Sequence, residues 1–253
     1  ILNSEKEEIE SEYEKYEKKG ISLISLKDKK YPKLLKNISN PPVFIYVKGK
    51  KEFSEKTIGV VGTRKISSYG SSVTEKIVRE LIGSGITVVS GLALGVDGIA
   101  HEQSLKCKGE TVAVVGTGLD IVYPHENKKI WERVEREGTI ISEYPLGTEA
   151  ARWTFPERNR IIVGLSKGIL ITESYKRGGA LITGKIALDE NRELFAVPGN
   201  IYYPSCEGCN DLIKKGEAKL ITSVEDILEE FNWDKINPVK KKIELQLSWK
   251  EEQ

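Results

Sequence analysis

Short apolar runs rich in β-branched residues alternate with helical patterns from Thr57 to about Thr222. This alternation constrains the fold more than any other feature of the sequence. Strands that are apolar on both faces need cover on both sides, and a parallel sheet between two layers of helices provides that cover. The sequence therefore predicts an α/β protein with a mostly parallel sheet and helices on both faces.

Seven strands and seven helices follow from this pattern. The predicted strands are Ile58–Val61, Thr87–Ser90, Thr111–Val115, Thr139–Ser142, Gly168–Thr172, Glu193–Val197 and Lys219–Thr222. The predicted helices are Tyr69–Ile82, Val96–Lys106, Lys128–Arg136, Glu157–Leu165, Ala180–Asp189 and Asn210–Lys214, with a last one after Ser223, where Asp226 completes a capping box.

The remaining segments divide the chain around a main domain at residues 57–232. Residues 1–20 are charged and helix-favouring, and we interpret them as the remnant of an N-terminal helical region. Residues 21–56 predict a small α/β lead-in packed on the main domain, with strands at Ile21–Leu26 and Val43–Val47 and a short helix over Tyr31–Ile38. Residues 233–253 have no strong period, so we expect a tail or a linker stub.

Composition excludes some classes of protein and leaves others open. The 39 Lys and Arg residues balance 38 Asp and Glu residues, so only local clustering can indicate a nucleic-acid partner. No apolar run approaches the roughly 20 residues that span a bilayer, so we expect a cytoplasmic protein without membrane contact. Three cysteines are too few for a disulfide framework, and the spacing of Cys206 and Cys209 lacks a second pair of ligands. We therefore expect no metal and no cofactor.

Glycines follow several of the predicted strands, where ligands bind in an open parallel sheet. Gly62, Gly91 and Gly116 come directly after strands, and Gly179 precedes a helix. Backbone N–H groups at such glycines, together with the positive end of a following helix, can hold a phosphate. A tight turn between a strand and a helix also needs glycine, so the glycines alone leave the presence of a ligand open.

Basic and aromatic residues share these loops. We expect seven cations to converge on one edge of the sheet: Arg64, Lys65, Arg152, Arg158, Arg160, Lys176 and Arg177. Trp153 and Phe155 lie among the arginines, which is the composition of a platform for single-stranded nucleic acid, where rings stack on bases and guanidinium groups hold phosphates. The alternative is that single cations are solvated or pair with Glu143, Glu157 or Glu173, and that the rings are buried in the core.

The sequence supports a catalytic function less well than it supports binding of single-stranded nucleic acid. Asp97 and His101 are four residues apart on one predicted helix and can pair, but no serine or cysteine nucleophile, carboxylate pair or Walker motif accompanies them. We expect a structural Asp–His pair. For Glu143 and Glu173, structural pairing with nearby arginines is favoured over a role as general base.

An ordered set of segments resembles the DNA-processing protein A (DprA/Smf) family. The segments are Ile58–Arg64, Tyr69–Gly70, Ser90–Asp97, Ala100–His101, Val112–Gly116, Tyr123–Pro124, Ser142–Pro145, Phe155–Ile162, Gly164–Ser166, Gly179–Thr183, Val197–Gly199 and Asn210–Ile213. They extend the resemblance over about residues 31–227. Each segment alone is weak evidence for the family, whereas the whole set in this order is specific to it.

The resemblance implies an extended Rossmann-like fold and a protein that is not an enzyme. It further implies sequence-independent binding and protection of incoming single-stranded DNA, loading of the recombinase RecA in natural transformation, and a homodimer formed through roughly residues 186–219. By motif position, Arg64 and Arg152 match the family's basic DNA-binding residues and Phe155 its base-contacting ring. The candidate DNA-binding residues are Gly62, Thr63, Arg64, Lys65, Ser90, Gly91, Gly116, Arg152, Phe155, Arg158, Asn159, Arg160, Arg177 and Gly179.

Two enzymatic alternatives remain on a related scaffold. A nucleotide phosphoribohydrolase of the lysine-decarboxylase-like type would carry a glycine-rich loop with a proline and a threonine, which Lys176–Ala180 lacks. A dinucleotide-dependent oxidoreductase needs glycine at the pyrophosphate turn, where this chain has Arg64.

Overall fold

The computed structural model describes residues 13–233. Most of the predicted N-terminal remnant and nearly all of the predicted tail therefore lie outside the described residues. Residues 13–18 are helical and lead into the first strand. Within the described range, no helix has the length and apolar character needed to cross a membrane.

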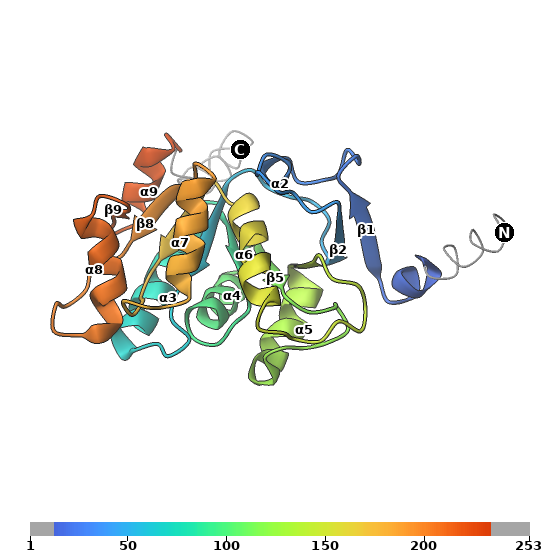
Figure 1. The fold of residues 1–253 in the computed structure, drawn as a ribbon, viewed down its shortest axis with the longest axis horizontal. Coiled ribbons are helices and arrows are strands. Elements are labelled where there is room, and N and C mark those ends of the chain that lie inside the picture. The colour runs from blue at the N-terminus through green and yellow to red at the C-terminus, as the bar shows by residue number, and fades with distance from the viewer. Residues whose placement is uncertain (1–12, 234–253) are drawn as a thin grey trace, which may run out of the picture.

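The strands of residues 13–233 form one sheet in the order β1-β2-β6-β5-β4-β3-β7-β8-β9 (Figure 1). Strands β3 to β9 pair in parallel, whereas β1 pairs with β2 and β2 with β6 in antiparallel fashion. The strands are β1 Ile21–Ser25, β2 Phe44–Gly49, β3 Thr57–Val61, β4 Thr87–Ser90, β5 Thr111–Val115, β6 Thr139–Ser142, β7 Gly168–Ile171, β8 Glu193–Ala196 and β9 Lys219–Leu220.

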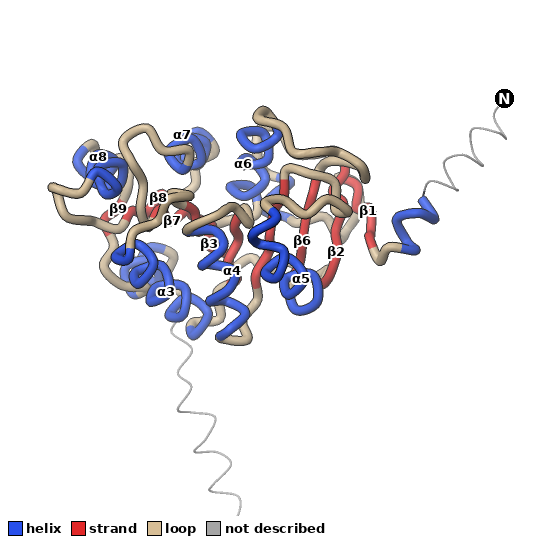
Figure 2. The backbone as a smooth tube through the Cα atoms, turned by 90° about the horizontal axis from the view of Figure 1, so that it is seen from below, coloured by secondary structure: helices blue, strands red, loops and turns tan. Residues whose placement is uncertain are grey.

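Helices cover both faces of this sheet. Figure 2 shows α6, α7 and α8 on one side of the strands and α3, α4 and α5 on the other. The helices are α2 Lys33–Lys36, α3 Ser68–Gly83, α4 Val96–Lys106, α5 Lys128–Glu137, α6 Thr154–Gly164, α7 Ala180–Asp189, α8 Glu207–Lys214 and α9 Glu225–Glu230. The predicted α/β class is thereby confirmed.

Each face has its own apolar core. Ile161 and Ile162 of α6 pack with Ile169 of β7 on one side, and Leu35 of α2 joins them. Ile77 of α3 belongs to a second cluster on the opposite side, together with α4 and α9 residues. The strands between the clusters are buried on both faces, which explains why their sequences are apolar throughout rather than alternating.

Most predicted boundaries agree with the structure within one or two residues, and the exceptions have local causes. Helix α6 begins at Thr154, three residues earlier than predicted, because Pro156 lies in its first turn, where a missing N–H costs nothing. Helix α8 begins at Glu207 rather than at Asn210. Only half of the expected capping box forms before α9: the Asp226 carboxylate accepts the backbone N–H groups of Thr222 and Ser223.

The predicted lead-in at residues 21–56 joins the main sheet. Strand β2 pairs with β6 over Tyr46–Gly49, and β1 pairs with β2 at the sheet edge. Helix α2 contacts α6 and contributes Leu35 to the core on that face. These residues therefore extend the same sheet and the same core as residues 57–232.

The strand order reverses direction at β3. From β3 the chain adds β4, β5 and β6 on one side, and then returns to place β7, β8 and β9 on the other. At such a switch point the loops that leave two adjacent strands diverge to opposite faces and open a crevice beyond the carboxyl ends. The topology therefore points to the loops after β3 and β7 as the place for a ligand.

His101 of α4 supports the core without titrating in the folded protein at neutral pH. Its ring is completely buried, and Nδ1 lies 2.8 Å from the Thr111 hydroxyl oxygen. The expected pairing with Asp97 is wrong, because the Asp97 carboxylate instead accepts the backbone N–H of Gly91. Burial lowers the pKa of His101 to about 3.

This shift predicts an acid-dependent loss of stability. Between about pH 6.5 and pH 3 the unfolded chain binds a proton at His101 that the folded protein excludes, so the free energy of unfolding falls as the pH falls. Relative to a His101→Gln variant, the unmodified protein should lose about 1.6 kcal/mol between pH 6.5 and pH 5. Urea unfolding of both proteins at the two pH values measures the difference, and parallel pH profiles would contradict the assignment.

Candidate nucleic-acid interface

An open groove of about 640 Å³ lies beyond the ends of β3 and β7, at the switch point. Its walls come from three loops and the helices that follow them. The first is the stretch Gly62–Lys65 after β3, the second is Arg152–Asn159 at the start of α6, and the third is Gly178–Thr183 at the start of α7. The groove thus combines segments that are more than 100 residues apart in the sequence.

Three exposed cations line the groove. Arg64 and Lys65 follow β3, and Arg152 precedes α6. None of them forms an ion pair within residues 13–233, although many other surface cations do. The structure therefore brings Arg64 and Arg152 to one surface, as the sequence predicted, with their charges available to a ligand.

Aromatic rings form the adjoining wall. The Arg64 guanidinium carbon lies 5.5 Å from the centre of the Phe155 ring, within the range of a cation–π contact. The Tyr123 ring lies 5.4 Å from that of Phe155, centre to centre. Trp153 is 58% exposed but turns toward Tyr144, with 5.9 Å between ring centres.

Sequence reasoning did not include Tyr123 among the binding residues. It lies in the connection between β5 and α5, outside the arginine-rich segment that drew attention to Phe155. The signal that could have indicated it is the Tyr123–Pro124 pair, which belongs to the segments resembling the family. The peptide bond between these two residues is cis.

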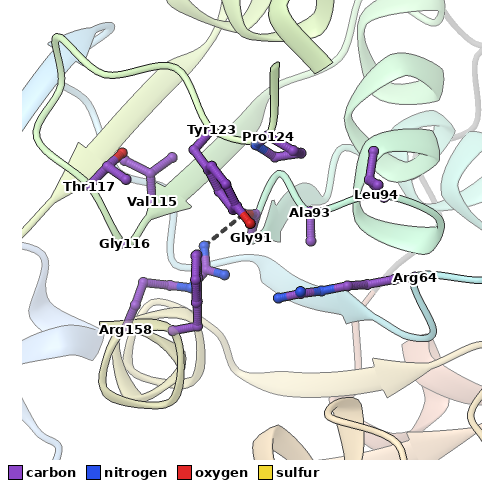
Figure 3. Close-up of a pocket in the computed structure, with 11 residues that line it drawn as sticks. Arg64, Gly91, Ala93, Leu94, Val115, Gly116, Thr117, Tyr123, Pro124 and Arg158 are labelled. Carbon is purple, nitrogen blue, oxygen red and sulfur yellow. Dashed lines mark hydrogen bonds between the residues drawn. The ribbon is translucent and has the colours of Figure 1, made fainter. Parts of the chain in front are cut away.

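A smaller hollow of about 50 Å³ opens from the groove toward the ends of β4 and β5 (Figure 3). Figure 3 shows Arg64 and Arg158 on one side of it and Tyr123 and Pro124 on the other. The backbone of Gly91 and Gly116 forms part of its wall. This small hollow thus combines guanidinium groups, rings and glycine backbone in its wall.

Arg158 forms the floor of the groove and not a free phosphate contact. It is 4% exposed, and its Nη1 donates to the backbone oxygen of Gly91 at 2.7 Å and to that of Val114. Burial lowers the pKa of Arg158 to about 10, which the nearby Asp97 carboxylate opposes, so the guanidinium stays charged at neutral pH. The expectation of an accessible Arg158 is therefore wrong: its charge is used inside the protein.

Arg160 does not line the groove, although the sequence predicted it there. Two residues along a helix correspond to a turn of about 200°, so Arg158 and Arg160 point to opposite sides of α6. The Arg160 Nη2 donates to both carboxylate oxygens of Glu143 at 2.6 Å. This pair lines a different hollow, together with Asp189 and Glu190. The alternative of structural pairing with Glu143 holds for this arginine.

The other carboxylate at a strand end, Glu173, does not pair with an arginine. It is buried, and it accepts hydrogen bonds from the Ser67 backbone N–H at 2.9 Å and the Ser67 hydroxyl at 2.5 Å. Its carboxylate thus holds the start of α3 beside the end of β7. The expected arginine partner is wrong at this position.

The glycines near the strand ends differ in what a larger side chain would contact. A Cβ on Gly62 would lie 2.4 Å from the Val96 side chain, so Gly62 allows α4 to pack against the end of β3. A Cβ on Gly91 would collide with Arg158 and Asp97. Gly179, in contrast, is exposed and has nothing within 4 Å of the same position, so its backbone faces open space in the groove.

The remaining candidates separate into two groups. Thr63, Asn159 and Gly179 line the groove, and Gly116 lines the smaller hollow beside it. Ser90 is buried, and its hydroxyl donates to the Val60 carbonyl at 2.6 Å. Arg177 is exposed on the loop after β7 but is not among the residues that line the groove.

The doubly covered sheet and the groove at its switch point define a ligand-binding protein of the Rossmann-like α/β class. Comparison with known proteins is more specific, because the family model for DNA recombination-mediator protein A matches residues 22–232. The chain belongs to this family, which includes the proteins called DprA and Smf.

Individual relatives agree with this membership. The chain is 41% identical to the DNA processing protein DprA of Bacillus subtilis, over 89% of this chain and 78% of the relative. It is also 41% identical to the Smf protein of Synechocystis, of which it spans only 55%.

Two solved structures are similar over most of the chain. The X-ray structure of DprA from Streptococcus pneumoniae has a TM-score of 0.82 and 38% identity, covering 89% of this chain and 77% of that one. DprA from Helicobacter pylori, whose structure concerns its mode of binding single-stranded DNA, has a TM-score of 0.76 and 28% identity, covering 85% and 97%.

The contrast between Arg158 and Arg160 yields a stability prediction. An Arg158→Met substitution leaves Asp97 buried without its compensating charge and two backbone carbonyls without a donor, so it should lower the free energy of unfolding by about 3 kcal/mol or more. Arg160→Met removes a partly exposed pair and should cost about 1 kcal/mol. Urea unfolding at neutral pH measures both, and equal losses would show that the buried guanidinium has no special structural role.

Proposed function

We propose that this chain binds single-stranded DNA in the groove between the loops after β3 and β7, without preference for sequence. The main observation behind the proposal is that Arg64 and Arg152, which are far apart in the sequence, line one groove beside the Phe155 ring. The likeness to a DprA structure concerned with single-stranded DNA supports the same ligand.

Phosphates would be held by three kinds of group. The unpaired cations Arg64, Lys65 and Arg152 neutralise charge along the groove. Helix α7 begins at Ala180, with Gly179 as its N-cap residue, so the positive end of a ten-residue helix faces the groove. The open space beside Gly179 lets a phosphate approach the backbone N–H groups closely.

Bases would stack on the aromatic wall. Phe155 is partly exposed and lies between Tyr123 and Arg64. Every base has a flat face that can stack on a ring, so such a wall binds without reading sequence. The rings also offer a reason for preferring single strands, because paired bases inside a duplex do not expose their faces.

We propose a binding function and not catalysis. Asp97, which lines the groove, and the nearby His101 and Glu173 already have partners within the protein: Asp97 accepts the Gly91 N–H, the His101 ring lies against the Thr111 hydroxyl, and Glu173 accepts from Ser67. A phosphoribohydrolase would instead release base from nucleoside monophosphates, which incubation with the purified chain tests directly.

Charge removal in the groove tests the proposal. An Arg64→Ala, Arg152→Ala double variant should weaken binding to oligothymidine by at least 100-fold at moderate salt. It should also reduce the slope of log affinity against log salt concentration by about 1.4, because two phosphate contacts are lost at about 0.7 each. Fluorescence anisotropy over a salt series measures both quantities.

Arg79→Ala is the matched control, since Arg79 is an exposed arginine on α3 that lines none of the hollows described above. Binding by the control should be unchanged. Unchanged binding by the double variant, with an intact fold by circular dichroism, would refute the groove as the DNA site.

We further propose that the bound DNA is protected and passed to the recombinase RecA during natural transformation, and that the chain acts as a homodimer through roughly residues 186–219. The family description as a recombination mediator supports the hand-over. Exposed apolar side chains within and next to this range, including Leu188, Ile201 and Leu220, support a protein contact there.

A charge in this surface should separate assembly from DNA binding. Leu220→Arg should shift the protein from dimer to monomer in sedimentation equilibrium, and should reduce RecA filament formation on DNA coated with single-strand-binding protein. Binding to short oligothymidine should stay within about threefold, because Leu220 does not line the groove. A monomeric unmodified protein would contradict the proposed dimer.

A further inference from the structure

A second hollow of about 460 Å³ lies beside the groove, on the side of α3 and α8. Tyr175, at the start of the loop after β7, lines both the groove and this hollow. The lining of the second hollow consists of Ser67, Ser68, Tyr69, Tyr175, Tyr203, Pro204 and Ser205. Three of these seven residues are tyrosines, and none is a carboxylate.

The three tyrosine rings are accessible to a ligand. Tyr69 is 41% exposed, Tyr175 is 40% exposed and Tyr203 is 56% exposed. They come from three separate segments: the start of α3, the loop after β7 and the loop after β8. An aromatic surface gathered from distant segments, open to solvent and free of acidic groups, offers ring faces to a flat ligand.

The segments that carry these rings are held in place. The Tyr69 hydroxyl donates to the Pro198 carbonyl at 2.6 Å. Tyr175 is fixed through its backbone, since its carbonyl accepts the Gly178 N–H at 2.9 Å and a Cβ on Gly208 would lie 2.7 Å from that same carbonyl.

The loop after β8 is tied to α8 in the same way. The Asn210 amide accepts the Gly199 N–H and donates to the Gly199 carbonyl, both at 3.0 Å. The Cys206 N–H donates to the Tyr203 carbonyl at 2.9 Å. A surface held in its binding shape loses little conformational entropy when a ligand binds.

Cations are close in sequence to residues that line the second hollow. Lys65 lies between the end of β3 and Ser67, and Lys176 and Arg177 follow Tyr175 directly. All three are exposed, and none forms an ion pair within the described part of the chain. Ring faces thus continue from the groove into the second hollow through Tyr175, and exposed cations precede and follow the lining residues in the sequence.

We infer that the second hollow is a further stacking subsite for the same strand of DNA, which takes the nucleotides that extend past Tyr175 from the groove. This inference rests on the proposed function, because it assigns the continuation of the same bound strand. It predicts that affinity rises with oligonucleotide length in two stages, the first set by the groove and the second by Tyr69, Tyr175 and Tyr203.

A length series with a Tyr203 variant tests the inference. Tyr203 lines the second hollow and not the groove, so Tyr203→Ala should weaken binding of a 12-nucleotide oligothymidine roughly 5- to 150-fold, the range for one lost base stack. Binding of a 4-nucleotide oligothymidine should change less than twofold. Tyr203→Phe should bind both lengths as the unmodified protein does, since stacking needs the ring and not the hydroxyl.

Tyr202→Ala is the matched control, because Tyr202 is 84% exposed on the same loop but does not line the hollow. It should leave both affinities unchanged. Equal weakening of the short and the long oligonucleotide by Tyr203→Ala, or no weakening of either, would overturn the subsite.

Tyr203 lies within the range of residues proposed above for the homodimer, so the assembly state of the Tyr203→Ala protein distinguishes a DNA subsite from a contact between two copies of the chain. Sedimentation equilibrium should give the assembly state of the unmodified protein. A shift toward monomer would mean that a second copy of the chain covers this surface, and would overturn the inference. If the unmodified protein binds the short oligonucleotide but its affinity does not rise with length, the subsite alone is refuted. If the unmodified protein binds no oligonucleotide, the proposed function itself is refuted.

Discussion

The buried guanidinium of Arg158 connects the scaffold to the groove. It donates to the carbonyls of Gly91 and Val114, which lie at the ends of β4 and β5, and it balances the buried Asp97 carboxylate at the start of α4. One side chain therefore ties α6 to two strands and to a helix of the opposite face. A charge held without water contact needs all of these partners at once, so the parts it joins have little freedom to move apart.

The position of the groove follows from this arrangement. With α6 anchored through Arg158, its first turn places Phe155 beside the loop after β3, within 5.5 Å of the Arg64 guanidinium. The close packing at Gly62 and Gly91 brings the start of α4 and the floor arginine against the strand ends. The exposed groups that face the groove are thus supported by a layer of buried polar contacts beneath them, which is how a rigid binding surface is built.

Arginines and glutamates near this edge of the sheet differ in their burial and in their partners, so residues of the same type have different roles. Arg64 and Arg152 are exposed and unpaired within the described residues, Arg158 is enclosed, and Arg160 is bound to Glu143 on the far side of α6. Glu143 and Glu173 likewise follow consecutive strands in the second half of the domain, yet one holds an arginine and the other holds the start of α3. Within the described residues, the charges that line the groove without an ion-pair partner are therefore a subset of those that the loops contain.

The sequence alone determined the class of the fold and most of its elements, because strand and helix patterns depend on local periodicity and on the need to bury apolar side chains on both faces of a sheet. It also indicated which edge of the sheet would bind a ligand, since glycines and cations follow the strands there. Only the tertiary structure decided which cations line the groove, that β1 and β2 extend the main sheet, and that Tyr69, Tyr175 and Tyr203 share a hollow. These outcomes depend on contacts between residues far apart in the chain and on the direction in which each side chain leaves its helix or loop, and neither property is encoded in the spacing of residue types.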